Sequence, residues 1–212
     1  MIVVVVTGTG TEIGKTWVTA ATAAALRERG LTVAARKPVQ SFAPGTTGTT
    51  DADLLAAATG EAPFEVCREH RWLPRAAAPP MAAEALGLAP FTIADLVSEI
   101  AVPPDAIVFV ESAGGVRSPL ADDGDTVSLA ASLDPALVVL VADAGLGTIN
   151  LVRLSAGALA AHRIVIYLNR FDEYDPLHAG NRDWLLTREG LEVVTDIEAL
   201  ADRIVPSRPA TG

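Results

Sequence analysis

Cysteine is almost absent from this sequence of 212 residues, in which Cys67 stands alone, and no apolar run approaches the length of a membrane span. A single cysteine excludes a disulfide within the chain and is typical of a protein in a reducing compartment. A membrane-spanning helix needs about 20 apolar residues, so we expect no span and no membrane partner. Residues 1–6 have no basic group ahead of the apolar ones, so we expect no signal peptide and a cytoplasmic protein.

Basic residues are also scarce, because 16 Lys and Arg stand against 26 Asp and Glu, for a formal net charge of −10. Such a chain repels polyanions, so we expect no nucleic-acid partner. The three histidines, His70, His162 and His178, have neither the spacing of metal ligands nor a serine or cysteine partner. Positive charge for binding an anion must therefore be local, and Lys15 and Lys37 are the candidates.

Half of the residues are apolar and a fifth are charged, which indicates a folded chain, and the length suits a single domain over residues 1–212. Apolar β-branched runs alternate with Ala/Leu-rich stretches. This alternation predicts an α/β fold with a mostly parallel sheet and helices on both faces. The predicted strands are 2–6, 32–35, 106–110, 136–142, 164–168 and 192–195, and the predicted helices are 15–29, 51–59, 91–100, 126–132, 150–161, 175–187 and 198–204.

Two internal stretches lack a clear period. Residues 41–50 are rich in Gly and Thr and are predicted to form a loop. Residues 62–90 contain five prolines, so we predict irregular chain there with one short helix near 81–86. The last residues, through Gly212, are expected to be frayed.

The most informative stretch is residues 2–16, IVVVVTGTGTEIGKT. A buried strand that runs into a Gly-rich turn and then a helix is a phosphate-binding arrangement, because the glycines let backbone N–H groups surround an anion. Lys15 adds a full positive charge, and the Thr16 hydroxyl is a ligand for Mg²⁺. The interval from Gly8 to Gly14 is one residue longer than in G-x-x-x-x-G-K-[ST], so this is a variant P-loop.

A dinucleotide-binding loop is the competing interpretation, since Gly8, Gly10 and Gly14 also occur at such spacing. That loop needs an acidic residue after the second strand, where this chain has Arg36 and Lys37. The phosphate loop is favoured because Lys-Thr has a role in it and none in the dinucleotide loop.

Parallel strands bring ligand-binding residues to their carboxyl ends. Glu111 ends an apolar strand and is predicted to be the carboxylate on the Mg²⁺ side. Lys37 follows another strand and, with Lys15, would stabilise charge on a transferring phosphoryl group. Asp51 and Asp53 lie at a helix start, where either could cap the helix or complete an oxygen shell for Mg²⁺ with Thr16 and Glu111.

These motifs together resemble the dethiobiotin synthetase family over most of the chain. The segments that carry the resemblance are GTGTEIGKT (8–16), KPVQS (37–41), Asp51-Ala52, ESAGG (111–115), GLGTIN (145–150) and Asn169. The resemblance implies a P-loop NTPase fold and an ATP-dependent ligase of biotin biosynthesis. In that family 7,8-diaminononanoate takes up CO2 as a carbamate, ATP phosphorylates the carbamate, and the second amine closes the ureido ring.

The resemblance also assigns residues. It places Mg²⁺ on Thr16, Asp51 and Glu111, and it makes Lys37, Lys15 and Thr11 catalytic. For the substrate it implies Ser41, Thr11, Lys37 and, from the partner subunit of a homodimer, Asn150. For the nucleotide it implies Glu12, Ile13, Gly14, Lys15, Thr16, Trp17, Glu111, Ser112, Ala113, Gly114, Asn169 and Arg170, the last two beside the base. Ser112 stands where the family has glycine.

Two other activities remain open. A P-loop switch or partitioning protein is disfavoured because Thr9, Gly10 and Thr11 occupy the region where its loop carries an extra lysine. A related amidoligase without its glutaminase domain would transfer ammonia to a carboxylated substrate. Motif matches alone do not separate these from the diamine ligase.

Overall fold

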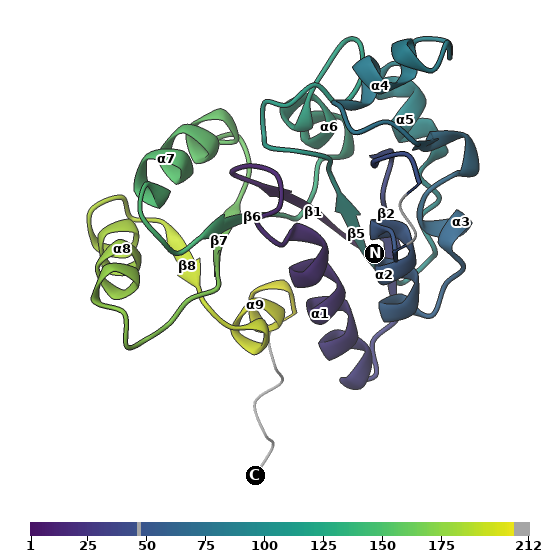
Figure 1. Cartoon of the computed structure of the whole chain (residues 1–212). Helices are drawn as coiled ribbons and strands as arrows, with labels where there is room; N and C mark the ends of the chain where they lie inside the picture. Colours follow the sequence, from purple (N-terminus) through teal and green to yellow (C-terminus); the bar gives the residue numbers. More distant parts are fainter. Residues whose placement is uncertain (46–47, 206–212) are drawn as a thin grey trace.

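The computed structural model describes residues 1–45 and 48–205. Within them, six strands form one parallel sheet in the order β2-β5-β1-β6-β7-β8 (Figure 1). The strands are β1 (Ile2–Gly8), β2 (Val33–Arg36), β5 (Ile107–Glu111), β6 (Leu137–Asp143), β7 (Ile164–Asn169) and β8 (Glu192–Val194). A separate parallel pair is formed by β3 (Gln40–Ser41) and β4 (Trp72–Leu73).

Helices cover both faces of the sheet, as Figure 1 shows. One face packs against α1 (Lys15–Glu28) and α9 (Ile197–Ile204). The other packs against α4 (Pro79–Ala85), α5 (Ile93–Glu99), α6 (Thr126–Leu133), α7 (Thr148–Ala158) and α8 (Pro176–Thr187). Beside β2 lie α2 (Asp51–Thr59) and α3 (Pro63–Val66), and the 3-10 turn η1 (Glu69–Arg71) connects α3 to β4.

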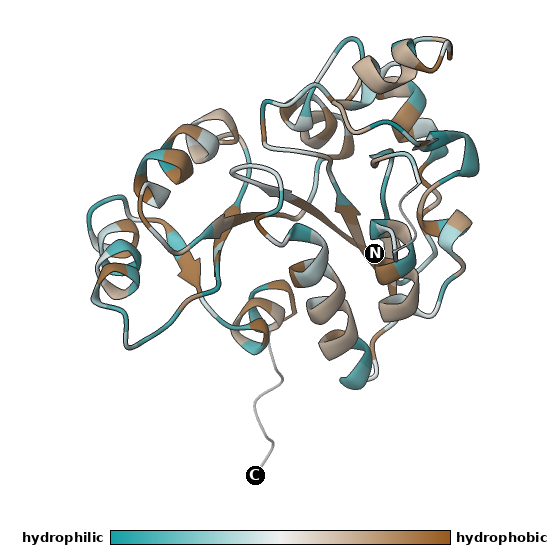
Figure 2. Cartoon of the chain, in the orientation of Figure 1, coloured by the Kyte–Doolittle hydropathy of each residue, from teal (hydrophilic) through white to brown (hydrophobic). Residues whose placement is uncertain are grey.

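The continuous apolar runs follow from burial on both faces. In β1, Val5 belongs to the core under one helical layer, whereas Val4 and Val6 belong to the core under the other. Successive strand residues point to opposite faces, so a strand covered on both sides must be apolar at every position. Figure 2 shows the central strands coloured as hydrophobic and the outer helices as mixed.

The structure confirms the predicted α/β fold and every predicted strand and helix, with ends that differ by up to three residues. The prediction for 62–90 is confirmed in its one short helix, which is α4, and is wrong in part elsewhere, because α3, η1 and β4 also lie there. Prolines supported rather than broke two of these helices, since Pro63 and Pro79 occupy first-turn positions that need no N–H donor.

The predicted loop over 41–50 is also corrected at its start, because Ser41 belongs to β3. Residues 46–47 of that loop and the residues 206–212 that were expected to be frayed lie outside the described part. Within the described part, no helix combines the length and the apolar character that crossing a bilayer requires.

Candidate active site

The glycine-rich loop after β1 leads into the positive end of α1. Gly14 precedes this helix with φ 91°, and a Cβ there would lie 2.2 Å from Nδ2 of Asn169, so only glycine fits. The Lys15 ammonium donates to the Gly10 carbonyl at 2.8 Å, which folds the loop back over its own lysine. Burial, and secondarily the nearby Lys37, lower the pKa of Lys15 to about 8.

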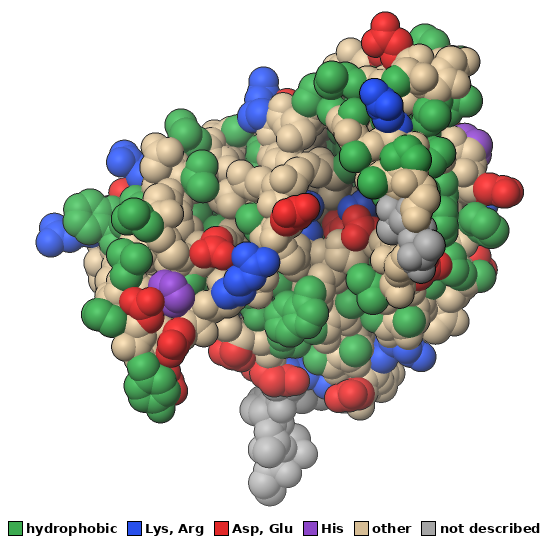
Figure 3. Space-filling model, in the orientation of Figure 1, with side chains coloured by type: hydrophobic (Ala, Val, Ile, Leu, Met, Phe, Trp, Pro, Cys, Tyr) green, Lys and Arg blue, Asp and Glu red, His purple; other side chains and the backbone are tan. Residues whose placement is uncertain are grey.

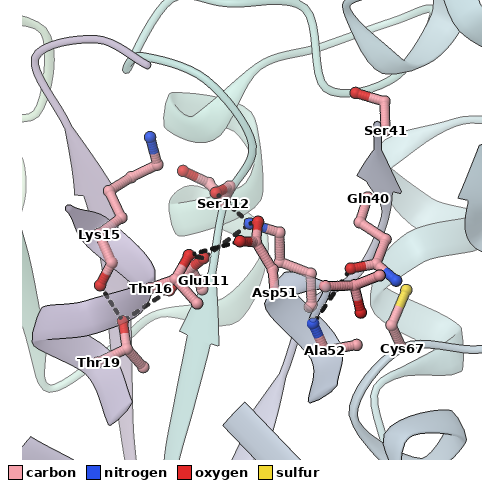
Figure 4. A network of polar contacts seen from close by, with 12 residues as sticks. Lys15, Thr16, Thr19, Gln40, Ser41, Asp51, Ala52, Cys67, Glu111 and Ser112 are labelled. Carbon is pink, nitrogen blue, oxygen red and sulfur yellow. Dashed lines mark hydrogen bonds and ion pairs between the residues drawn. The ribbon is translucent and has the colours of Figure 1, made fainter. Parts of the chain in front are cut away.

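Three oxygen-bearing side chains meet beside this loop. Thr16 Oγ1 lies 2.9 Å from Asp51 Oδ1 and 2.8 Å from Glu111 Oε1. One hydroxyl proton cannot serve two carboxylates, so the contact brings more negative charge than it neutralises. Figure 4 shows these three side chains turned toward one another, while the amine of Lys15 extends away from them.

Lys37 supplies the compensating charge. Its Nζ lies 2.7 Å from Glu111 Oε1, 2.8 Å from Asp51 Oδ2 and 3.4 Å from the Ser112 carbonyl. Burial alone lowers the pKa of Lys37, but the two carboxylates outweigh burial and raise it above its usual value. For Asp51 the opposing effect of burial is outweighed mainly by Lys37, so its pKa is lowered.

Glu111 is fully buried and held from a second side. Thr19, one turn along α1 from Thr16, donates its hydroxyl to Glu111 Oε2 at 2.7 Å. The parallel register places Glu111 beside Val6, at the carboxyl end of the sheet where the loop begins. Ser112, which stands where the family resembled by the sequence has glycine, donates its hydroxyl to Thr7 Oγ1 at 3.0 Å. The added hydroxyl is therefore hydrogen-bonded within the buried interior.

A cavity of about 670 Å³ opens over this cluster. Figure 3 shows this face hollowed, with acidic and basic side chains at the bottom of the hollow. The predicted residues that line the cavity are Thr11, Glu12, Gly14, Lys15, Thr16, Lys37, Ser41, Asp51, Ala113 and Gly114. The structure thus brings together the phosphate loop, both lysines and residues from the ends of three strands.

The two aspartates at the start of α2 are separated by the structure. Asp53 closes a capping box with Thr50, accepting from its backbone N–H at 2.9 Å and from its hydroxyl at 2.8 Å. Asp51 instead faces Thr16 and Lys37. Two carboxylates and one hydroxyl form an oxygen-only donor set, which suits Mg²⁺. Thr16, Asp51 and Glu111 are therefore the residues that could hold this metal.

Several lining residues were not found from the sequence. Residues 76–79 form one wall of the cavity, although they fall in the stretch predicted to be irregular. Gln40 also lines the cavity, and its Oε1 accepts from the Ala52 N–H at 3.1 Å beside Asp51. Ser41 donates to the Ala77 carbonyl at 2.7 Å, which ties β3 to that wall. No local pattern announces such long-range bonds.

The remaining predicted residues lie outside the cavity wall. Asn169 and Arg170, at the end of β7, contact the backbone of the phosphate loop. Trp17 is 55% exposed on α1. Asn150 is exposed in the first turn of α7 and does not reach the cavity of its own chain. Ile13, Glu111 and Ser112 lie behind the lining residues.

Comparison with known proteins gives a consistent result. A family model described as an AAA domain matches residues 3–207. An ATP-dependent dethiobiotin synthetase BioD from Rhodococcus jostii is 39% identical over 96% of this chain and 89% of its own length. Proteins of the same name from Corynebacterium efficiens and an Anaeromyxobacter species are 42% and 37% identical, over 74% and 93% of this chain and 70% and 92% of theirs.

Among solved structures, a DUF1611 family protein from Anabaena variabilis superposes with a TM-score of 0.53 at 19% identity. The match covers 97% of this chain and 57% of that chain. At this identity the similarity concerns the fold alone. The parallel sheet, the strand–loop–helix arrangement at Lys15 and the AAA-domain family model together confirm the P-loop fold predicted from the sequence.

Proposed function

The chain belongs to the ATP-dependent dethiobiotin synthetase family, and we propose how its residues carry out that family's reaction. Its function is ATP-dependent synthesis of dethiobiotin, a ligase step in biotin biosynthesis. The observation that most directly supports the roles below is that Lys15, Thr16, Lys37 and Asp51 border one cavity, while the buried Glu111 contacts both Thr16 and Lys37.

The substrates are 7,8-diaminononanoate, CO2 and ATP. One amine of the diamine attacks CO2, loses a proton and becomes a carbamate. A carbamate oxygen then attacks the γ-phosphorus of ATP, which releases ADP and leaves a carbamic–phosphoric anhydride. The second amine attacks the carbonyl carbon, loses a proton and expels phosphate, closing the ureido ring. No step needs a protein nucleophile, so this chain has to position its substrates and stabilise charge.

The nucleotide binds along the phosphate loop. The backbone of Glu12, Ile13 and Gly14 and the side chains of Lys15 and Thr16 surround the phosphates at the positive end of α1. Trp17, the next residue of α1, is also assigned to the nucleotide site. The strand ends complete the nucleotide site with Glu111, Ser112, Ala113, Gly114, Asn169 and Arg170.

Thr16, Asp51 and Glu111 would hold Mg²⁺, which when bound neutralises charge on the phosphate oxygens. Lys37 also borders the cavity, and its ammonium contacts the carboxylates of Asp51 and Glu111. We assign its ammonium to the oxygens of the phosphoryl group in transfer, where a fixed cation lowers the barrier. Lys15 stabilises the same charge from the loop.

Thr11 and Ser41 face the cavity from its two sides and are assigned to the carbamate end of the substrate. The Ser41 hydroxyl already donates its proton to the Ala77 carbonyl. A lone pair on Ser41 Oγ therefore remains available to accept a hydrogen bond from an N–H group of the substrate. Positively charged surroundings disfavour an ammonium nearby and favour both the free amine and the carbamate anion.

We further propose a homodimer in the cytoplasm. Leu146, Leu151 and Leu154 are 91%, 45% and 68% exposed, and the last two lie on one side of α7. Asn150 is exposed in the first turn of α7, four residues before Leu154 and therefore on the same side of the helix. The start of α7 has no side-chain cap, so the free backbone N–H groups of its first turn suit the carboxylate of the substrate bound to the partner subunit.

The test is a coupled assay of ADP and phosphate release with diaminononanoate, bicarbonate, Mg²⁺ and ATP. We expect release only when diamine and bicarbonate are both present, and dethiobiotin in a one-to-one ratio with ADP by mass spectrometry. A rate of ATP hydrolysis that is unchanged by the diamine but increased by a protein or a membrane would favour a P-loop switch. Product formed from ammonia and a carboxylated substrate would favour an amidoligase.

A further inference from the structure

Two consecutive carbonyls of the phosphate loop are held by two consecutive residues at the end of β7. Arg170 Nη2 donates to the Glu12 carbonyl at 2.9 Å, and Asn169 Nδ2 donates to the Ile13 carbonyl at 2.8 Å. These partners are more than 150 residues apart in the sequence. Both bonds therefore join the phosphate loop to the end of β7, a strand that is distant from the loop in the sequence.

The direction of these bonds matters for anion binding. In a trans peptide the N–H points opposite to the C=O of the same plane. Holding the carbonyls of Glu12 and Ile13 toward β7 therefore turns the N–H groups of Ile13 and Gly14 the other way. Gly14 lines the cavity, whereas Asn169 and Arg170 do not.

The loop needs such support because its backbone is unfavourable at Glu12. Glu12 has φ 56°, in the left-handed region that L-residues rarely adopt, whereas Gly14 adopts its φ of 91° without such a cost. Strained conformations persist only where surrounding contacts fix them. Arg170 itself has φ 57°, so the residue that holds Glu12 is fixed in an unusual conformation too.

Asp143 fixes Arg170 in turn. Its Oδ2 lies 3.0 Å from Arg170 Nη1, while its Oδ1 accepts from the Gly145 N–H at 2.9 Å. Asp143 and Asn169 are paired in the register of β6 and β7, so the two strand ends present the carboxylate and the guanidinium side by side. The guanidinium thus spans from Asp143 to the loop carbonyl of Glu12.

We propose that Arg170 is a positioning residue for the phosphate loop and that Asp143 is the anchor of Arg170. Arg170 acts through the carbonyl of Glu12 and not through the nucleobase. The inference builds on the proposed function in one respect, which is that the loop binds a triphosphate. Its consequence is that loss of Arg170 weakens the binding of every triphosphate alike.

The first experiment compares Arg170→Met with wild type by calorimetry, using Mg·ATP, Mg·CTP and inorganic tripolyphosphate. We expect all three affinities to fall by the same factor of about five, the effect of losing one hydrogen bond of ordinary net strength, since the Arg170 side chain is 60% exposed. A loss confined to ATP, or to the two nucleotides, would overturn the proposal in favour of contact with the nucleoside. Unchanged affinities would overturn it too. Arg163→Met, at the other end of β7 in an exposed ion pair with Glu192, is the matched control.

A second variant separates positioning from simple charge. Asp143→Asn removes a negative charge and keeps an oxygen for the Gly145 N–H. Charge alone predicts tighter triphosphate binding, whereas loss of the anchor predicts binding that is about twofold weaker. Triphosphate binding that is tighter or unchanged in Asp143→Asn would contradict the proposal that Asp143 anchors Arg170. In the double variant the two losses should not add, because both act through the same guanidinium.

Kinetics provide the third measurement. Arg170→Met should raise KM for ATP and leave KM for the diamine unchanged, a split that general destabilisation does not produce. Equal increases in both KM values would count against positioning. Because the binding measurements use no diamine, an inactive wild type would refute the proposed function while the triphosphate affinities still decide this inference.

Discussion

The Lys37 ammonium lies 2.7 Å from Oε1 of Glu111, although 74 residues separate the two in the chain. Lys37 is 3% exposed and Glu111 is fully buried, so each is the other's main compensation for lost hydration. Asp51 closes the group on the side of the cavity. Lys37, which borders the cavity, is therefore also a structural element, and the two roles can be separated by experiment.

Lys37→Ala is expected to lower turnover by about a hundredfold to a thousandfold, the usual cost of removing one charge-stabilising donor from a transition state. Nucleotide should still bind, because the phosphate loop keeps its backbone donors and Lys15. The rate is measured in the coupled assay and the ATP affinity by calorimetry. Rates close to wild type would contradict the role given to Lys37.

The same substitution is expected to lower the free energy of unfolding by about 3–5 kcal/mol, because it leaves the buried Glu111 carboxylate unpaired. Adding Glu111→Gln should recover most of that loss, since the uncompensated charge disappears. Urea unfolding without metal compares the single and double variants. Mg²⁺ should stabilise Lys37→Ala more than wild type. A double variant as unstable as the single one would argue against the charge explanation.

Asp51→Asn and Asp53→Asn form a matched pair within α2. Asp51→Asn should raise the Mg²⁺ concentration for half-maximal activity by about tenfold or more, because a proposed ligand loses its charge. Asp53→Asn should cost at most about 1 kcal/mol of stability through the capping box and leave the Mg²⁺ requirement unchanged. Metal titrations of activity decide between them, and an equal Mg²⁺ dependence in both variants would exclude Asp51 as a ligand.

ATP affinity should depend on pH through Lys15, whose pKa burial lowers to about 8. A bound triphosphate favours the ammonium form, so binding raises this pKa and takes up a proton. Below the free pKa the lysine is already charged and adds no dependence. Above it the affinity falls, by up to about tenfold per pH unit, until the pKa of the complex is reached.

Calorimetry in two buffers of different ionisation enthalpy measures this proton uptake directly. Lys15→Arg is the control, because arginine remains charged throughout this range. The variant should bind ATP with an affinity that is nearly independent of pH over the same interval. A flat profile in the wild type would show that Lys15 is already charged in the free protein.

Leu154→Glu is expected to dissociate the proposed dimer, since the leucine is 68% exposed on α7 and a buried charge there would be unpaired. If Asn150 serves the partner's substrate, KM for the diamine should rise while ATP affinity stays constant. Light scattering and kinetics measure these two quantities. Leu86→Glu, at an exposed leucine beyond α4, is the control and should change neither. A wild type that is monomeric at working concentration would refute the assembly.

The parallel sheet was predictable because its cause is local and repeated. Strands covered by helices on both faces must be apolar throughout, and each strand of the sheet is marked in the sequence by such an apolar run. The same holds for the phosphate loop, where two glycines, Lys15 and Thr16 stand within one short segment. Helix ends were predictable to within a few residues where a cap marks them, as Thr50 and Gly60 do for α2.

The partners of the side chains were not predictable in the same way. The local pattern left Asp51 and Asp53 equivalent, and only the family resemblance named Asp51; the packing of α2 against α1 is what turns Asp51 toward Thr16. Nothing in the sequence indicated that Asn169 and Arg170 also donate to carbonyls of the phosphate loop. It gave no sign that residues 76–79 form a wall of the cavity.

The amino-acid sequence by itself determined the elements, the chemistry of the anion-binding loop and the family to which the chain belongs, since these depend on spacing within short segments. Tertiary structure alone decided which contacts Asp51 and Asp53 make, how Lys37 is neutralised and what holds the phosphate loop in its strained conformation. The physical reason is that a hydrogen bond or an ion pair depends on distances of about 3 Å, and such distances between residues far apart in the chain exist only once the sheet and its helical layers have packed.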